Sequence, residues 1–164
     1  MPRLALYTFA VGKGVWGSDM LSGFAAALPS VFAEAGRSDG FIATAQSAKP
    51  DPARPAFGQV YGRWCLFAVL RFYDGGIVPG EVTQASTLSL WRDIEAARRF
   101  AYSGLHKAAL AKRGEWFRRP EWPAYVLWWV DDDETPTWEN ACRRLERLND
   151  LGPTSAAFRS RRGH

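Results

Sequence analysis

Short hydrophobic runs in which both alternate positions are apolar dominate the pattern of the chain. The run LALYTFAV at residues 4–11 places Leu4 and Leu6 on one side and Tyr7 and Phe9 on the other, because successive strand residues point to opposite faces. Runs of similar character cover residues 39–46, 81–91 and 124–130. Their β-branched and aromatic content is typical of strands. The pattern predicts four strands, of which the first and last are apolar on both faces.

Three other segments show the three-to-four-residue spacing of amphipathic helices. The first, residues 18–36, starts with a capping Ser18 and contains Pro29, which predicts a kink or a division into two short helices. The last, residues 135–152, starts with a Thr-Pro pair and stops at Gly-Pro. The clearest helix is residues 93–113, whose apolar stripe consists of Ile94, Ala97, Ala101, Leu105 and Ala108.

The remaining segments complete a single domain over residues 1–164. Residues 47–58 hold three prolines and predict a loop, and residues 64–73 fit either a strand or a short buried helix. The order of elements predicts an α+β fold, a ferredoxin-like antiparallel sheet with helices on one face. Strands that are apolar on both faces then need a second cover. A second copy of the sheet would supply it, which predicts a homodimer.

Composition narrows the class of protein. The 164 residues are 47% hydrophobic and 23% charged, which is typical of one globular domain, and the eight Trp indicate an unusually aromatic interior. No apolar run approaches the roughly 20 residues of a membrane span, and the N-terminus lacks signal-peptide features, so we expect a soluble cytoplasmic protein without a membrane partner. Cys65 and Cys142 lie far apart and are expected to be small buried hydrophobes. They predict a reducing compartment.

The net charge of +4 is spread along the chain and does not predict nucleic-acid binding. Its arginine pairs are interleaved with Asp and Glu, and the basic tail at residues 159–164 is expected to be a solvated end. The acidic run at residues 131–134 is interpreted as a solvated turn before a helix, and no metal site is predicted. Nucleotide-binding and hydrolase motifs are likewise missing from the sequence.

From Thr87 onward the chain carries a combination of motifs. SLWRDIEAARRFAYSGLHKAALAKRGEWF is followed by VLWWV and then by PTWENACRRLERLNDLGPTSAAF. This combination resembles an uncharacterised bacterial domain family of the dimeric α/β-barrel superfamily. The resemblance implies a homodimeric α/β barrel with a pocket between the sheet and the helices of each subunit. Relative to that family, the segment at residues 47–80 looks expanded.

The superfamily includes cofactor-independent monooxygenases of antibiotic biosynthesis, heme-degrading oxygenases, muconolactone-type isomerases and polyketide cyclases. A strand-end Trp and a helix His, here Trp91 and His106, are familiar in the heme-degrading branch, where the His binds the iron. The resemblance therefore implies two enzyme hypotheses, one without a cofactor and one with heme. A non-catalytic ligand-binding dimer is the third hypothesis.

His106 is the only histidine apart from the final residue, and it is the leading catalytic candidate. On a continuous helix it shares a flank with Tyr102 at i−4 and Arg113 at i+7. The imidazole can move protons near neutral pH, Tyr102 can donate to an oxyanion, and Arg113 can hold an enolate or carboxylate. Gly104 costs a helix about 1 kcal/mol, which indicates a close approach there. In the alternative role, His106 only bonds a backbone carbonyl and Arg113 is solvated.

The aromatic residues admit two interpretations. In the first, they line a hydrophobic cavity for a small apolar or aromatic metabolite, with Trp91, Trp116, Phe117, Trp128 and Trp129 as binding residues. In the second, they pack the core and the dimer interface. Trp128 and Trp129 are adjacent in a strand and must point to opposite faces, one towards the helices and pocket and one towards the partner subunit. The leading hypothesis is cofactor-independent oxygenation, or isomerisation or cyclisation by His106.

Overall fold

The computed structural model describes residues 1–45, 64, 68–74 and 84–160. The predicted loop at 47–58 lies outside these residues. Along the chain the elements are β1 (Arg3–Val11), the 3-10 helix η1 (Asp19–Leu21), α1 (Ser22–Arg37), β2 (Phe41–Thr44), α2 (Arg71–Asp74), β3 (Gln84–Trp91), α3 (Ile94–Ala101), α4 (Gly104–Ala111), α5 (Arg113–Trp116), β4 (Tyr125–Val130) and α6 (Trp138–Leu151).

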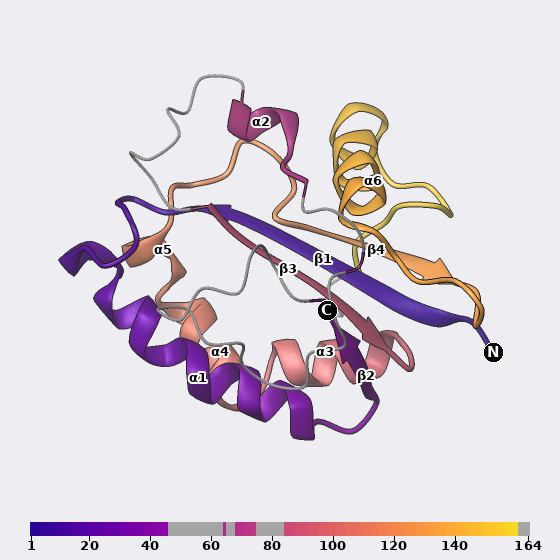
Figure 1. Ribbon diagram of the computed structural model, residues 1–164, viewed down its shortest axis with the longest axis horizontal. Coiled ribbons are helices and arrows are strands. Elements are labelled where there is room, and N and C mark those ends of the chain that lie inside the picture. The colour runs from indigo at the N-terminus through magenta and orange to yellow at the C-terminus, as the bar shows by residue number, and fades with distance from the viewer. Residues whose placement is uncertain (46–63, 65–67, 75–83, 161–164) are drawn as a thin grey trace.

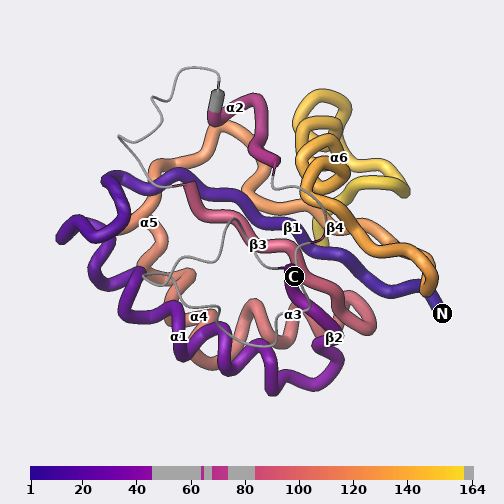
Figure 2. Tube along the Cα trace, in the orientation of Figure 1, coloured from indigo at the N-terminus to yellow at the C-terminus, as the bar shows by residue number. Residues whose placement is uncertain are grey.

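The four strands form one antiparallel sheet in the order β2-β3-β1-β4. The chain trace in Figure 2 shows β1 and β4, which are far apart in the sequence, running side by side. The α+β class and the four predicted strands are confirmed. The strand order is compatible with the predicted ferredoxin-like topology, to which α6 is added.

Both faces of the sheet are covered by helices of the same chain (Figure 1). On one face Tyr7 and Phe9 pack with the buried stripe of α6. On the other face Leu4 and Trp91 pack with α1 and α3, through Ala35, Ala96 and Ala97. The prediction of helices on one face only is therefore wrong. The apolar stripe of α6 predicts a buried helix but not which face of the sheet it covers.

Helix α6 forms where the sequence predicts a helix, although it begins later. Thr137 is its N-cap and accepts a hydrogen bond from the Asn140 backbone N–H at 3.1 Å, so Pro136 lies before the cap. Gly152, with φ of 76°, follows its last turn. The predicted amphipathic helix is confirmed by a stripe of buried residues, which are Trp138, Ala141, Cys142, Leu145 and Leu148.

The outer edge of β4 is paired with the C-terminal segment. Leu127 and Phe158 exchange both backbone hydrogen bonds, at 2.8 and 3.0 Å, in an antiparallel bridge. Segment 154–158 therefore follows α6 back to the sheet and covers the middle of its β4 edge.

The helices predicted at residues 18–36 and 93–113 need correction. Helix α1 continues through Pro29 as one 16-residue element. The predicted helix at 93–113 is instead divided into α3 and α4, and α5 begins at its last residue. The described part of segment 64–73 contains the short helix α2. None of the helices within the described ranges is both long and apolar enough to cross a membrane.

Leu145 tests whether α6 holds the sheet face that it covers. Leu145 is completely buried, so Leu145→Ala is expected to lower the free energy of unfolding by about 2–5 kcal/mol, measured by urea denaturation. Leu151→Ala on the same helix is the control, because Leu151 is 68% exposed. Equal and small effects of both substitutions would contradict the packing of α6 on the sheet.

Candidate functional site

The site around His106 is created by the break between α3 and α4. Gly104 begins α4 with φ of +53°, a left-handed conformation that costs other residues about 1–2 kcal/mol. A Cβ at this position would collide with the carboxylate of Glu34 on α1. The close approach indicated by Gly104 is therefore that of Glu34, a residue of the same chain.

Two hydrogen bonds replace the helical bond that a continuous helix would make at this point. In such a helix the Leu105 N–H would donate to the Ala101 carbonyl. Here Leu105 N–H donates to Glu34 Oε2 at 3.1 Å, and His106 Nδ1 lies 2.8 Å from the Ala101 oxygen. The carboxylate of Glu34 thus caps α4, while His106 satisfies the last turn of α3.

The bond to Ala101 fixes the tautomer of the neutral imidazole. A carbonyl oxygen only accepts, so Nδ1 carries the proton and Nε2 keeps its lone pair. Burial lowers the pKa of His106 below its ordinary value of 6.5, although the Ala101 bond and Glu34 oppose this shift. The imidazole is therefore neutral at pH 7, and Nε2 can accept a proton or bind a metal ion.

An aromatic stack connects His106 to the sheet. Its ring centroid lies 4.7 Å from that of Phe100 at an interplanar angle of 49°, and Phe100 stacks on the ring of Trp91 at 5.2 Å. Trp91 Nε1 donates to Ser89 Oγ at 2.9 Å, and Phe41 packs edge-on against the indole. Trp91 and His106 thus lie on the same face of the sheet, but Phe100 separates them and Trp91 is only 1% exposed.

Tyr102 and Arg113 are not assembled around His106. The break at residues 102–104 and the end of α4 at Ala111 remove the helical spacing that predicted a shared flank. Tyr102 is 44% exposed, and the exposed Arg113 donates to the Leu110 carbonyl at 3.1 Å. Two features of the alternative structural role, a His106–carbonyl bond and a solvated Arg113, are therefore present.

The other predicted binding residues lie in separate places. Trp116 and Phe117 pack against Phe24, with ring centroids 5.7 and 4.8 Å apart, at the junction of α1 and α5. Trp128 is buried on the α6 face of the sheet, whereas Trp129 on the other face is 45% exposed. The predicted opposite orientation of these two tryptophans is confirmed. The aromatic residues do not line one common cavity.

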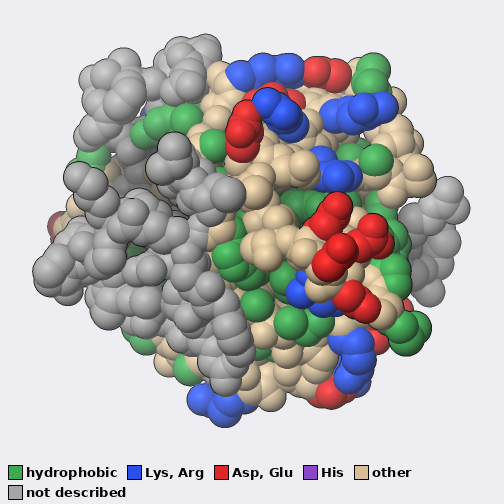
Figure 3. Space-filling view, turned by 45° about the vertical axis from the view of Figure 1, so that its right-hand side comes forward, with side chains coloured by type: hydrophobic (Ala, Val, Ile, Leu, Met, Phe, Trp, Pro, Cys, Tyr) green, Lys and Arg blue, Asp and Glu red, His purple; other side chains and the backbone are tan. Residues whose placement is uncertain are grey.

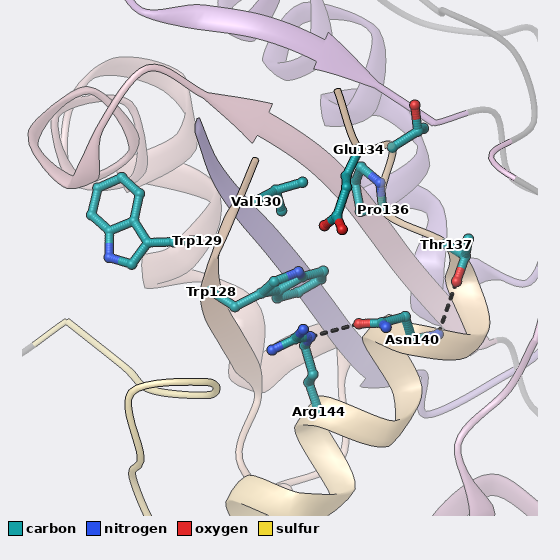
Figure 4. Close-up of a pocket in the computed structure, with 9 residues that line it drawn as sticks. Trp128, Trp129, Val130, Glu134, Pro136, Thr137, Asn140 and Arg144 are labelled. Carbon is teal, nitrogen blue, oxygen red and sulfur yellow. Dashed lines mark hydrogen bonds between the residues drawn. The ribbon is translucent and has the colours of Figure 1, made fainter. Parts of the chain in front are cut away.

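A pocket of about 70 Å³ lies beside Trp128, which the sequence predicted as a cavity residue, but its other walls were not predicted (Figure 4). Its walls come from β4, the loop at 131–137 and the first turns of α6. Arg144 lies over the Trp128 ring, 5.3 Å from its centroid, and its Nε–H donates to Asn140 Oδ1 at 2.5 Å. The i, i+4 spacing of Asn140 and Arg144 on α6 is the signal in the sequence that could have indicated this pair.

The acidic run at residues 131–134 lies at one rim of this pocket and forms a turn. Glu134 N–H donates to the Asp131 carbonyl at 3.0 Å, and the Arg3 side chain donates to the carbonyls of both residues. Within the described ranges, no group of three or more His, Cys, Asp or Glu side chains could hold a metal ion. On the face shown in Figure 3, basic and acidic side chains are interspersed.

Comparison with known proteins gives one match. Residues 3–163 match the family described as a domain of unknown function (DUF3291). No curated protein and no solved structure matches the chain.

The lowered pKa of His106 predicts a pH-dependent stability. As the pH falls below 6.5, the unfolded state binds the proton before the folded state does, so the free energy of unfolding decreases. The contribution of neutral His106 to the free energy of unfolding is complete above pH 6.5. It is lost as the pH falls through the lowered folded-state pKa. Urea denaturation at about pH 7.5 and about pH 5.5 should therefore show a larger loss for the wild type than for His106→Gln. Equal losses would contradict the burial of a neutral imidazole.

Proposed function

Because its match covers residues 3–163, the chain belongs to the DUF3291 family, and we propose that it is a small-molecule enzyme in which His106 moves a proton. The substrate is an apolar or aromatic metabolite that binds beside Phe100 and His106. The reaction is cofactor-independent oxygenation, or isomerisation or cyclisation, each of which begins by removing a proton from carbon or oxygen. The observation that carries this proposal is the hydrogen bond from His106 Nδ1 to the Ala101 carbonyl.

That bond supports a base because it leaves the other ring nitrogen available. A general base is most effective when its pKa lies near the working pH and its ring is held in one orientation. Burial keeps the imidazole neutral, and Glu34 limits the fall of its pKa. A carbonyl bond is also what a purely structural histidine makes, so the proposal depends on reactivity at Nε2.

The surroundings of the imidazole support an aromatic substrate. Phe100 stacks on Trp91 with an interplanar angle of 23°, and this pair gives the His106 side chain an apolar neighbour of fixed orientation. Planar rings pack on such surfaces in offset or edge-on geometry. Oxyanion stabilisation by Tyr102 and Arg113 stays a prediction, as do the substrate contacts assigned to Trp116, Phe117, Trp128 and Trp129.

The proton-transfer step can be tested with an enolisable aromatic ketone such as 2-tetralone. The wild type is expected to accelerate exchange of its α-protons in D₂O, followed by NMR, and an oxygen electrode records any oxidation of the enolate. His106→Gln should reduce the enzymatic exchange by about 10²- to 10⁴-fold. Leu105→Ala is a control on the same helix, because the Leu105 side chain is 46% exposed. The same exchange rate in His106→Gln and wild type would contradict the proposal.

Heme binding is the second candidate, and the same hydrogen bond favours it. A histidine that binds a metal through one nitrogen usually donates its other N–H to a carbonyl or carboxylate. His106 would hold the iron through Nε2, and heme would supply the chemistry of oxygen activation. Addition of hemin should then shift the Soret band with the wild type but not with His106→Ala. Identical spectra for the two proteins would exclude His106 as the axial ligand.

The homodimer and its barrel arrangement also stay predictions. The reason that the sequence offered, an uncovered sheet face, does not hold, because α6 covers the face that β1 shares with Trp128. The exposed Trp129 on the opposite face is the side chain that we propose for the contact with a partner subunit. Light scattering of the wild type and of Trp129→Glu tests this, with a dimer expected for the wild type and a monomer for the variant.

A further inference from the structure

The pocket beside Trp128 lies on the opposite face of the sheet from His106, and the proposed proton transfer does not depend on it. Trp128 packs in the core that contains α6, whereas the Phe100 stack packs in the core that contains α1 and α3. In Figure 4 the Arg144 guanidinium and the Glu134 carboxylate, which come from α6 and from the loop after β4, both lie near the Trp128 ring. Charges of both signs therefore border one small pocket.

Arg144 has hydrogen-bonding capacity that the chain does not use. Its Nε–H donates to Asn140 Oδ1 and one Nη donates to the Ala156 carbonyl, which leaves three of its five N–H groups without a described acceptor. Arg144 lines the pocket, so these three N–H groups are available to a ligand there. No described carboxylate pairs with Arg144, although five other arginines have one: Arg71, Arg92, Arg98, Arg99 and Arg143.

The position of the guanidinium is fixed before any ligand arrives. Stacking on Trp128, the Asn140 amide and the Ala156 carbonyl hold it from three directions. Burial lowers the pKa of Arg144, and Glu134 partly opposes this effect. Arginine nevertheless stays charged. A half-buried cation without a counter-ion favours an anionic ligand.

Glu134 lies across the pocket from Arg144, and hydrogen bonds to its main chain fix its position. The turn from Asp131 and the bonds from Arg3 fix its main chain, while its carboxylate lines the pocket without forming an ion pair with any described residue. Arg144 and Glu134 attract each other but are too far apart to form an ion pair. A group placed between them would contact both if it carried a carboxylate and an ammonium ion close together.

We propose that this pocket binds the zwitterionic end of a free α-amino acid. The carboxylate binds the free N–H groups of Arg144, the ammonium group binds Glu134, and the Trp128 ring forms the floor. A volume of about 70 Å³ suits the five heavy atoms of this group, because one water molecule needs only about 10–15 Å³ of cavity measured in the same way. The amino-acid side chain would extend towards solvent, so the pocket selects the backbone group.

Glycine is the minimal probe of this proposal, and NMR of the indole N–H of Trp128 is the readout. That resonance is assigned by its loss in Trp128→Phe. Glycine should shift it saturably with a dissociation constant on the order of 1 mM, as expected for a ligand of five heavy atoms. Acetate and methylamine each carry only one of the two charges. Each should bind at least about tenfold more weakly than glycine.

Two substitutions distinguish the roles of the charges. Arg144→Gln should weaken glycine binding about tenfold to a hundredfold. Arg147→Gln removes the same charge from α6 away from the pocket and should change glycine binding much less than Arg144→Gln does. If Arg144→Gln is unfolded, Glu134→Gln still tests the proposal, because Glu134 is exposed. It should weaken glycine binding and strengthen acetate binding.

Three results would overturn the proposal. One is the absence of any Trp128 shift at about 50 mM glycine, which is well above the expected dissociation constant. Another is acetate binding as strong as glycine binding, together with tighter binding of both by Glu134→Gln, which would indicate a simple anion site. The third is equal loss of glycine binding in Arg147→Gln and Arg144→Gln. His106→Gln should leave glycine binding unchanged, so this result is independent of the proposed enzymatic activity.

Discussion

Both faces of strand β1 are apolar and must be buried, and the other elements are arranged to cover them. Leu4, Ala5 and Tyr7 are completely buried although they alternate between the two faces of the sheet. Full burial of a large apolar side chain contributes about 1.5–3 kcal/mol. Two separate cores result, one closed by α6 and one by α1 and α3. Each core carries its own candidate site at its margin.

The candidate histidine depends on a contact between helices that are distant in the sequence. Glu34 takes the N–H of Leu105, the Ala101 carbonyl is thereby left for His106, and Gly104 provides the space for the carboxylate. The orientation of the imidazole is therefore set jointly by α1, α3 and α4. A substitution at Glu34 would change the capping of α4, the electrostatic environment of His106 and the tilt of its ring together.

Local patterns predicted most of the elements because alternation and helical spacing are properties of a few neighbouring residues. They predicted β1, β4 and the stripe of α6. They did not predict the break at Tyr102–Gly104, because the apolar stripe continues past it to Leu105 and the break is stabilised by Glu34, which lies 71 residues before Leu105. The charged walls of the pocket at Trp128 were missed for the same reason. Arg144 and Glu134 come together only when α6 lies against β4.

The bridge between Leu127 and Phe158 has a consequence for how the sheet can grow. An exposed outer strand offers free N–H and C=O groups that can recruit a strand from another molecule. In this chain the returning segment occupies those groups at the centre of β4. A foreign strand would have to displace residues 154–158 before pairing there. The short stretch after α6 therefore blocks edge-to-edge pairing at the middle of β4.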